Sequence, residues 1–348
     1  MPDRTRNSVV QYAFDARPEA GDTMQVAPGV YWLRMPLPFV LGHINLWLLE
    51  DGDGWTIVDT GVYVEESEKI WNAIFASTMN GQSVGRVIVT HLHPDHAGCA
   101  GWLCSGTGAE LWMTREEYFL CRILVADTGR DAPDAGKQFY RAAGFGEDAL
   151  ERYTRMFGLF GKFVSPLPQS YHRLRDEDEI TIGERSWTIL IGRGHSPEHA
   201  CLFCEELNLL IAGDQLLPTI SSNVSVHPTE PLANPLAEWL ASLRHLQNRL
   251  PEDVLVLPAH GKPFRNAHAR LEELIAEHDV GLQKLEALCA SPKRATDVFP
   301  ALFRREIDDR NLIMATGEAI AHLNYLVTMG RMSVDPDDDG VNWFSAAR

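Results

Sequence analysis

Residues 90–98 read Thr90-His91-Leu92-His93-Pro94-Asp95-His96-Ala97-Gly98, which places three imidazoles and one carboxylate within six positions. The apolar run before them, Arg86–Thr90, is typical of a short buried strand. Imidazole nitrogen and carboxylate oxygen are ligands that zinc and similar cations take in proteins. His91 and His93 project to the same side of an extended strand end, and the turn at Pro94 directs Asp95 and His96 toward a second position. One loop is therefore predicted to serve two adjacent metal ions.

Three single residues later in the chain share one local pattern, in which an apolar strand and a small or turn residue precede a metal-ligand type. They are His195 after Trp187–Ile191, Asp214 at the end of Leu209–Asp214, and His260 at the end of Val254–His260. A lone histidine or aspartate at a strand end is more often a cap or a structural hydrogen-bonding group. Repetition of the pattern beside the 90–98 cluster favours metal binding instead.

Taken in order, these motifs resemble those of the metallo-β-lactamase superfamily. The matching segments are His91-x-His93-x-Asp95-His96, Gly194-His195, Gly213-Asp214, Ala259-His260-Gly261 and the strand-end turn Asp59-Thr60-Gly61. The resemblance covers roughly Met24–Gly261. It implies an α/β (α+β layered) fold, an αββα sandwich of two mixed sheets with helices outside and the site at one rim. Residues 1–265 would form this catalytic domain.

The same resemblance implies how the ligands divide between two metal ions. The first ion would be held by His91, His93 and His195, the second by Asp95, His96 and His260, and Asp214 would bridge them. Aspartate rather than cysteine at the bridging position resembles the glyoxalase II-like and lactonase-like branches.

The segment Ser196-Pro197-Glu198-His199 departs from the pattern, because many relatives have glycine where this chain has Glu198. Glu198 brings a charge close to a metal loop, which makes a relative's substrate unsafe to transfer. His199 is interpreted as a residue behind the ligands rather than a ligand, since the seven ligands are already complete.

The resemblance implies a dinuclear metal-dependent hydrolase with two divalent metal ions, zinc first, with iron or manganese as alternatives. A metal-bridging hydroxide would cleave an ester, thioester or lactone, with Asp95 or Asp214 as the catalytic carboxylate that accepts the proton. The substrate would be a small acyl compound. Two alternatives stay open: a nuclease of the same fold, and a diiron redox protein of the flavodiiron kind. The second would carry a flavodoxin-like domain, and no phosphate-cradling loop of such a domain follows His260.

The formal net charge is −17, from 48 acidic and 31 basic residues in a chain of 348. Such a surface repels polyanions, which disfavours the nuclease alternative and predicts neither nucleic-acid nor membrane partners. No apolar run is long enough for a membrane span, and no apolar segment of a secretion signal follows Met1–Asn7, so we expect a cytoplasmic protein. The six cysteines are scattered, and Cys201 and Cys204 lie in an apolar run, which favours buried thiols.

Residues 114–165 are helical in pattern and rich in aromatic residues, unlike the strands around them. They are interpreted as a helical insertion that either packs on its host or forms a lid over the site. Because connections longer than about 12–15 residues are usually functional or disordered, we expect this insertion to control substrate choice rather than metal binding. Its Tyr118 and Tyr140 are candidate substrate contacts, as are His43 and Asn45 at a strand start.

Residues 266–348 are predicted to form a small helical domain whose last helix runs through Gly317–Gly330. The pattern resembles the winged-helix-like module of some superfamily members. Acidic residues slightly outnumber basic ones, so it is interpreted as a packing or homodimer-forming module and not as a DNA reader. Asp335–Asp339 is expected to be a frayed acidic tail, and Gln25–Met35, near the other end, a single strand.

Overall fold

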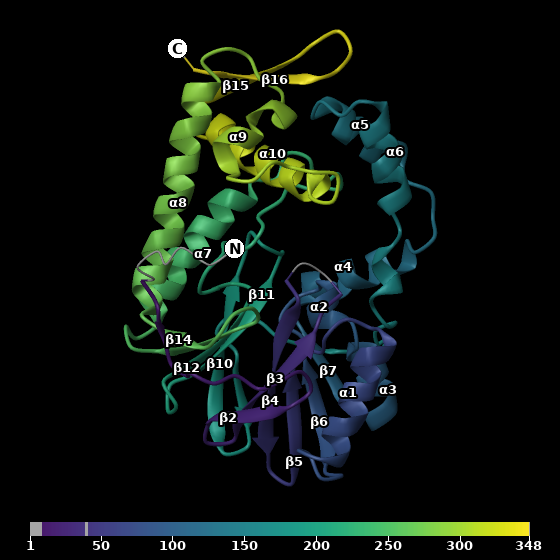
Figure 1. The fold of residues 1–348 in the computed structure, drawn as a ribbon, viewed down its shortest axis with the longest axis vertical. Coiled ribbons are helices and arrows are strands. Elements are labelled where there is room, and N and C mark those ends of the chain that lie inside the picture. The colour runs from purple at the N-terminus through teal and green to yellow at the C-terminus, as the bar shows by residue number, and fades with distance from the viewer. Residues whose placement is uncertain (1–8, 39–40, 348) are drawn as a thin grey trace.

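The computed structural model describes residues 9–38 and 41–347, in which two seven-stranded sheets pack face to face between layers of helices (Figure 1). The predicted αββα sandwich is confirmed. The expectation for Met1–Asn7 lies outside the described residues. Within the described ranges, no helix is both long and apolar enough to cross a bilayer.

The first sheet follows chain order from β2 to β8. Its strands are β2 (Thr23–Ala27), β3 (Val30–Pro36), β4 (His43–Asp51), β5 (Gly54–Val58), β6 (Ser83–Ile88), β7 (Glu110–Met113) and β8 (His172–Arg173). The strands from β2 to β5 are antiparallel and those from β5 to β8 are parallel. The helices α1 (Glu65–Ala76) and α3 (Ala100–Thr107) cover its outer face, where Trp71 and Leu103 are buried.

The expected single strand Gln25–Met35 is wrong, because β2 and β3 form a hairpin. Gly29 has a φ of 74°, a left-handed conformation that suits glycine, and it follows Pro28 in the turn. The Pro-Gly pair was the signal for this break.

The second sheet has the spatial order β1, β14, β13, β12, β11, β10, β9. The bounds are β1 (Gln11–Tyr12), β9 (Glu179–Ile182), β10 (Arg185–Gly192), β11 (His199–Cys204), β12 (Leu209–Gly213), β13 (Leu255–Pro258) and β14 (Phe264–Arg265). β12 and β13 run parallel, and α7 (Pro235–Arg249) packs on the outer face.

The core between the sheets is apolar on both inner faces. The rings of Trp32 and Trp47 of the first sheet stack with their centroids 6.2 Å apart, and Trp187 of the second sheet is buried in the same cluster. Because helices cover the outer faces, the central strands are buried on both sides, and β11, β12 and β13 are buried at every position. All six cysteines are buried free thiols, as predicted for Cys201 and Cys204.

The insertion consists of α4 (Arg115–Ala126), α5 (Asp134–Ala142), α6 (Glu147–Met156) and the short 3-10 helix η1 (Phe160–Lys162). α4 packs into the outer core of the first sheet through Tyr118 and Cys121. α5 and α6 reach the opposite end of the molecule, where their small apolar cluster contacts Leu312 and Ile313 (Figure 1). The insertion therefore packs against both the sandwich and the C-terminal region.

The C-terminal region comprises α8 (Ala267–Leu288), η2 (Ala295–Val298), α9 (Phe299–Leu302), α10 (Leu312–Thr328) and the hairpin of β15 (Met332–Pro336) and β16 (Asn342–Ala346). Its apolar side chains share one core cluster with the outer face of the second sheet. The region is helical as predicted, while the winged-helix interpretation and the boundary after residue 265 stay predictions.

The expected frayed tail at Asp335–Asp339 is wrong, because these residues end β15 and begin the turn of a hairpin. Asp337 accepts hydrogen bonds from the backbone N–H of Val341 at 2.9 Å and the indole of Trp343 at 2.8 Å. These hydrogen bonds order the acidic turn, whereas its composition alone predicts a solvated, frayed segment. α10 also begins at Leu312, five residues before the expected start at Gly317.

Candidate metal centre

Strand ends from both sheets bring all seven predicted ligands to one rim of the sandwich. His91 and His93 follow β6, and the next turn of chain, α2 (Pro94–Ala97), carries Asp95 and His96. From the second sheet, His195 follows β10, Asp214 follows β12 and His260 follows β13. The side chains form two groups that could each hold a metal ion: His91, His93, His195 and Asp214, and beside it Asp95, His96 and His260.

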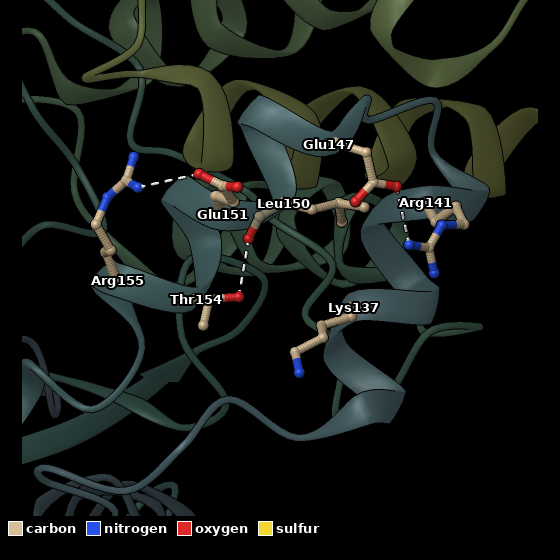
Figure 2. Close-up of a pocket in the computed structure, with 7 residues that line it drawn as sticks. All are labelled: Lys137, Arg141, Glu147, Leu150, Glu151, Thr154 and Arg155. Carbon is tan, nitrogen blue, oxygen red and sulfur yellow. Dashed lines mark hydrogen bonds and ion pairs between the residues drawn. The ribbon is translucent and has the colours of Figure 1, made fainter.

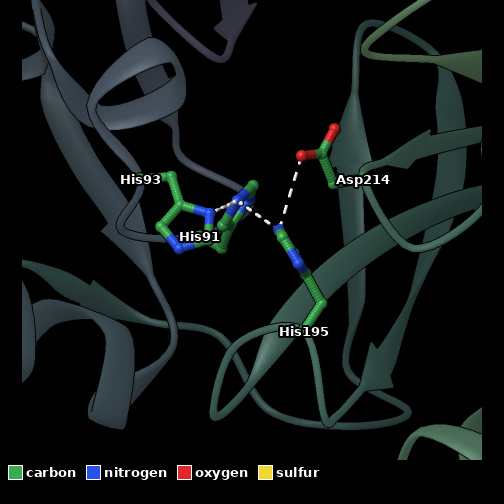
Figure 3. A group of neighbouring side chains, drawn as sticks. All are labelled: His91, His93, His195 and Asp214. Atoms are coloured by element: carbon green, nitrogen blue, oxygen red, sulfur yellow. Dashed lines mark hydrogen bonds and ion pairs between the residues drawn. The ribbon is translucent and has the colours of Figure 1, made fainter. Parts of the chain in front are cut away.

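The first group presents three imidazole nitrogens and one carboxylate oxygen to a common point (Figure 3). Nε2 of His91 lies 2.9 Å from Nδ1 of His93 and 3.3 Å from Nε2 of His195, which lies 3.4 Å from Oδ2 of Asp214. Ligand atoms bound at about 2.0–2.2 Å to a tetrahedral ion lie about 3.3–3.6 Å apart. Two of the three distances fall in this range and the His91–His93 distance is shorter, and all four ligand atoms lie within 4.8 Å of one another, so the group could hold a metal ion.

Three buried polar atoms where the second group meets Asp214 have no hydrogen-bond partner among the described residues: Nε2 of His96, Nε2 of His260 and Oδ1 of Asp214. Nε2 of His260 lies 3.4 Å from Oδ1 of Asp214, and Nε2 of His96 lies 3.6 Å from it. Buried polar atoms are almost always satisfied, so three that converge indicate a missing partner. A cation fits this donor set.

The protonation states of the first ligand group also suit a cation. Burial lowers the pKa of His91 and, with the neighbouring His195, lowers that of His93 to about 3, which keeps both imidazoles neutral. Burial would raise the pKa of Asp214, but His260 and His96 hold it well below its usual range. Neutral imidazole and ionised carboxylate are the forms that bind metal.

Most of the ligand imidazoles are held from behind through their second ring nitrogen. Nδ1 of His96 donates to Oδ2 of Asp59 at 2.7 Å, Nδ1 of His195 to the carbonyl of Asn223 at 2.7 Å, and Nδ1 of His260 to the carbonyl of His43 at 2.9 Å. Such contacts fix the tautomer and ring orientation of metal-binding histidines.

Comparison with known protein families agrees with this geometry. Residues 40–260 match the family described as the metallo-beta-lactamase superfamily, and residues 282–347 match a metallo-beta-lactamase-like C-terminal domain. The chain belongs to the metallo-β-lactamase superfamily. It is thus a metallo-hydrolase family member whose His and Asp clusters form a candidate metal site.

Individual relatives of this superfamily member support the assignment. The crystal structure of a beta-lactamase domain protein from Burkholderia ambifaria is 43% identical, covers 97% of this chain and 98% of its own, and superposes with a TM-score of 0.89. The probable metallo-hydrolase YqjP of Bacillus subtilis (strain 168) is 24% identical over 84% of this chain and 91% of its own length. An atrochrysone carboxyl ACP thioesterase of Aspergillus fumigatus is 25% identical over 67% of this chain and 41% of its own length.

Asp59 belongs to the Asp59-Thr60-Gly61 turn, for which the sequence predicted no particular contact with the ligands. It is buried, with a φ of 61°, a left-handed conformation that aspartate tolerates better than most residues. Its Oδ1 accepts the backbone N–H of Thr90 at 2.8 Å while Oδ2 accepts from His96. One carboxylate thus orients both the 90–98 loop and a candidate ligand.

Replacement of Asp59 by asparagine is expected to weaken metal binding about 10–100-fold, the usual cost of losing a partner behind a ligand. Asparagine offers one acceptor oxygen, which cannot serve both Thr90 and His96. Metal content after dialysis against a weak chelator measures the effect. Asp53→Asn, in the exposed β4–β5 turn, removes the same charge and should retain wild-type metal content. Equal retention by both variants would remove Asp59 from this role.

His199 lies behind the site in this superfamily member. Its Nε2 accepts the backbone N–H of Asp214 at 3.1 Å, and its ring stacks on His91 at 4.7 Å. Only glycine fits at position 213, because a Cβ atom there would lie 2.5 Å from Nε2 of His199. The contact is that of a residue that positions Asp214.

The four candidate substrate residues have different surroundings. Tyr118 is buried and donates to the carbonyl of Pro168, and Tyr140 is buried in the cluster of α5 and α6, so neither presents a surface to a substrate. Asn45 is buried and uses its amide on the carbonyls of Pro258 and Gly261, which fixes the His260 loop. These three side chains make structural contacts within the fold, and a substrate contact by any of them stays a prediction.

His43 remains a candidate substrate contact. Its ring is half-buried, 6.3 Å from the ring of His260, and Gly261 donates to its Nε2 at 3.4 Å. Burial and the positive charge of Arg34 lower its pKa to about 4, so the imidazole is neutral near pH 7.

A separate surface hollow of about 340 Å³ lies on α5 and α6, and none of the seven candidate ligands lines it (Figure 2). It is lined by Lys137, Arg141, Glu147, Leu150, Glu151, Thr154 and Arg155. Its charges pair with one another, Arg141 with Glu147 and Arg155 with Glu151. The hollow therefore offers no converging unsatisfied groups, unlike the metal centre.

Proposed function

We propose that this chain is a dinuclear metal-dependent hydrolase that cleaves an ester, thioester or lactone, and that a small acyl thioester is its preferred substrate. Two zinc ions are the proposed cofactors, with iron or manganese as alternatives. The metallo-hydrolase family and the two adjacent ligand groups support this proposal.

The observation that carries the proposal is the position of the Asp214 carboxylate. Oδ2 faces His195 of the first group, while Oδ1 faces His96 and His260 of the second. A single carboxylate that addresses two ligand sets is the arrangement expected of a bridge between two ions. We assign the seven ligands as the resemblance implied, with Asp214 as the bridge.

When bound, the two ions would supply a water of lowered pKa and a Lewis acid for the carbonyl oxygen. Asp95 is proposed as the residue that would accept the proton released by that water. Its Oδ2 lies 3.4 Å from Nε2 of His260, and its side chain is slightly more exposed than that of Asp214. Burial opposes the charge of Asp95, but His96 and His260 lower its pKa, so an ionised acceptor is available. Asp214 holds both ligand groups in place.

The preference for a thioester rests on leaving-group chemistry and on a relative. A thiol of ordinary pKa, about 8.5, departs as a thiolate without a proton donor, whereas an alcohol needs one. The neutral ring of His43 has no acid proton to give near pH 7 beyond its weak N–H. The relative from Aspergillus fumigatus that bears a thioesterase name supports the same substrate class.

The test compares one acyl group on several leaving groups. The zinc-loaded protein is assayed against an acyl-CoA thioester, the matching oxygen ester, a lactone of equal length and a phosphodiester. We expect kcat/KM for the thioester to exceed that for the ester by at least about tenfold, within the range that active sites discriminate. Asp95→Asn should lower kcat and weaken binding of the second ion, because Asp95 is also one of its proposed ligands. Turnover of the phosphodiester alone would replace the proposal with a nuclease.

A further inference from the structure

Glu117 of α4 is a buried carboxylate that does not belong to either ligand group. Its side chain is fully buried, at 0% exposure, in the first turn of a helix whose other acidic residue, Glu116, is exposed. A buried ionised carboxylate is costly unless it is paired or accepts strong hydrogen bonds. The contacts of this carboxylate therefore indicate what it is for.

Each oxygen of Glu117 accepts a backbone N–H from a different metal loop. Oε2 accepts from Leu92 at 2.9 Å, and Oε1 accepts from Glu198 at 2.8 Å. Leu92 stands between the candidate ligands His91 and His93, while Glu198 lies in the loop that carries His195. Burial raises the pKa of Glu117, and these two amide donors favour the charged form against it.

The two loops come from different sheets. The loop of Leu92 leaves β6 of the first sheet, and the loop of Glu198 connects β10 and β11 of the second. The first ligand group needs nitrogens from both loops, since Nε2 of His91 and Nε2 of His195 lie 3.3 Å apart. A single carboxylate that binds both loops sets this separation across the sandwich.

Glu198 completes the link from the other side. Its carboxylate accepts the backbone N–H of Glu116 at 3.0 Å, at the N-terminus of α4, where a negative charge is favourable. Its carbonyl accepts the hydroxyl of Thr114 at 2.8 Å. The residue that departs from the family pattern thus joins the His195 loop to α4. α4 is therefore hydrogen-bonded to the loop that carries His195, and control of substrate choice by the insertion stays a prediction.

We propose that Glu117 is a positioning residue for the metal centre, holding the loops of His91/His93 and His195 at the distance that one metal ion requires. The inference rests on the proposed metal centre and not on the substrate. Glutamine at this position would keep the side-chain length but replace one acceptor oxygen with an NH₂ group that faces an N–H donor. One loop then loses its anchor, and the ligand nitrogens lose their fixed spacing.

The experiment measures zinc affinity of the full chain by competition with a chromophoric chelator. Glu117→Gln is expected to weaken zinc binding about 10–100-fold, as other losses behind metal ligands do. Glu116→Gln is the matched control, because it makes the same change one residue earlier on an exposed side chain, and it should bind zinc as the wild type does.

Equal zinc affinity of Glu117→Gln and wild type would overturn the inference. A lower melting temperature of the metal-free variant in that case would show that Glu117 stabilises the fold alone. Failure of the wild type and of Glu116→Gln to bind zinc would instead contradict the metal centre itself.

A measurement on the wild type decides the matter if Glu117→Gln does not fold. Amide hydrogen exchange at Leu92 and Glu198 is followed in the metal-free and zinc-loaded chain. A shared carboxylate predicts that both amides are protected and that zinc slows both together. Slowing at one amide without the other shows that the two loops move independently and overturns the inference.

Discussion

Asp214→Ala is expected to abolish hydrolysis and to release at least one of the two proposed metal ions. Both carboxylate oxygens of Asp214 face ligand groups, so alanine removes a donor from each group at once. The loss of kcat/KM should exceed about 100-fold, the upper range for residues behind the ligands. Elemental analysis of the purified variant, beside its kinetics, measures both effects.

The matched comparison for Asp214→Ala is His199→Ala. His199 contacts the backbone N–H of Asp214 and not the convergence point of the ligands. Removal of the His199 side chain should lower kcat/KM about 10–100-fold while both ions remain bound. If His199→Ala proved the more damaging of the two, the assignment of the seven ligands would be wrong.

Metal removal is expected to eliminate activity and to lower the melting temperature on the order of 10 °C. Ligands that bind the native state stabilise it by about 4.1 kcal/mol at 1,000 times their Kd, and a chain of this size shifts a few degrees for each kcal/mol. Without a cation, the buried Nε2 atoms of His96 and His260 have no hydrogen-bond partner in the part of the chain that the structure describes. Calorimetry before and after chelation measures the shift.

Readdition of metal provides the control for that prediction. Zinc, manganese and iron are added singly to the chelated protein, and each should restore stability to the degree that it binds. A metal-free chain that melts at the same temperature and gains no activity with any of the three would contradict the proposed centre.

The candidate ligands were predictable because each follows an apolar strand and a turn. Strand ends of a layered sheet fold meet at a rim, so His195, Asp214 and His260 converge on the 90–98 loop although long segments separate them. The order of the motifs also indicated the sandwich. These features depend on local pattern, which a sequence displays directly.

The supporting contacts were not predictable from the same pattern. From the sequence, Glu116 and Glu117 are two acidic residues in the first turn of a helix, both expected to face solvent. Only tertiary packing, which buries Glu117, distinguishes them. Tyr118 and Tyr140 illustrate the converse, since aromatic residues serve a packed core as well as a pocket wall. The sequence indicates which residue types are present, but burial decides which of them a ligand can reach.

The carbonyl of Asn223 holds His195, and the side-chain amide of the same residue donates to Glu318 of α10 at 2.8 Å. Val226 in the same loop donates its N–H to the carbonyl of Gly317 at 3.0 Å. We therefore expect an ion bound at His195 and the packing of α10 to be coupled through Asn223, and such coupling is reciprocal. Occupancy of the metal centre would then stabilise the packing of α10, and a mutation that loosens α10 would weaken metal retention at His195, although α10 begins more than one hundred residues further along the chain.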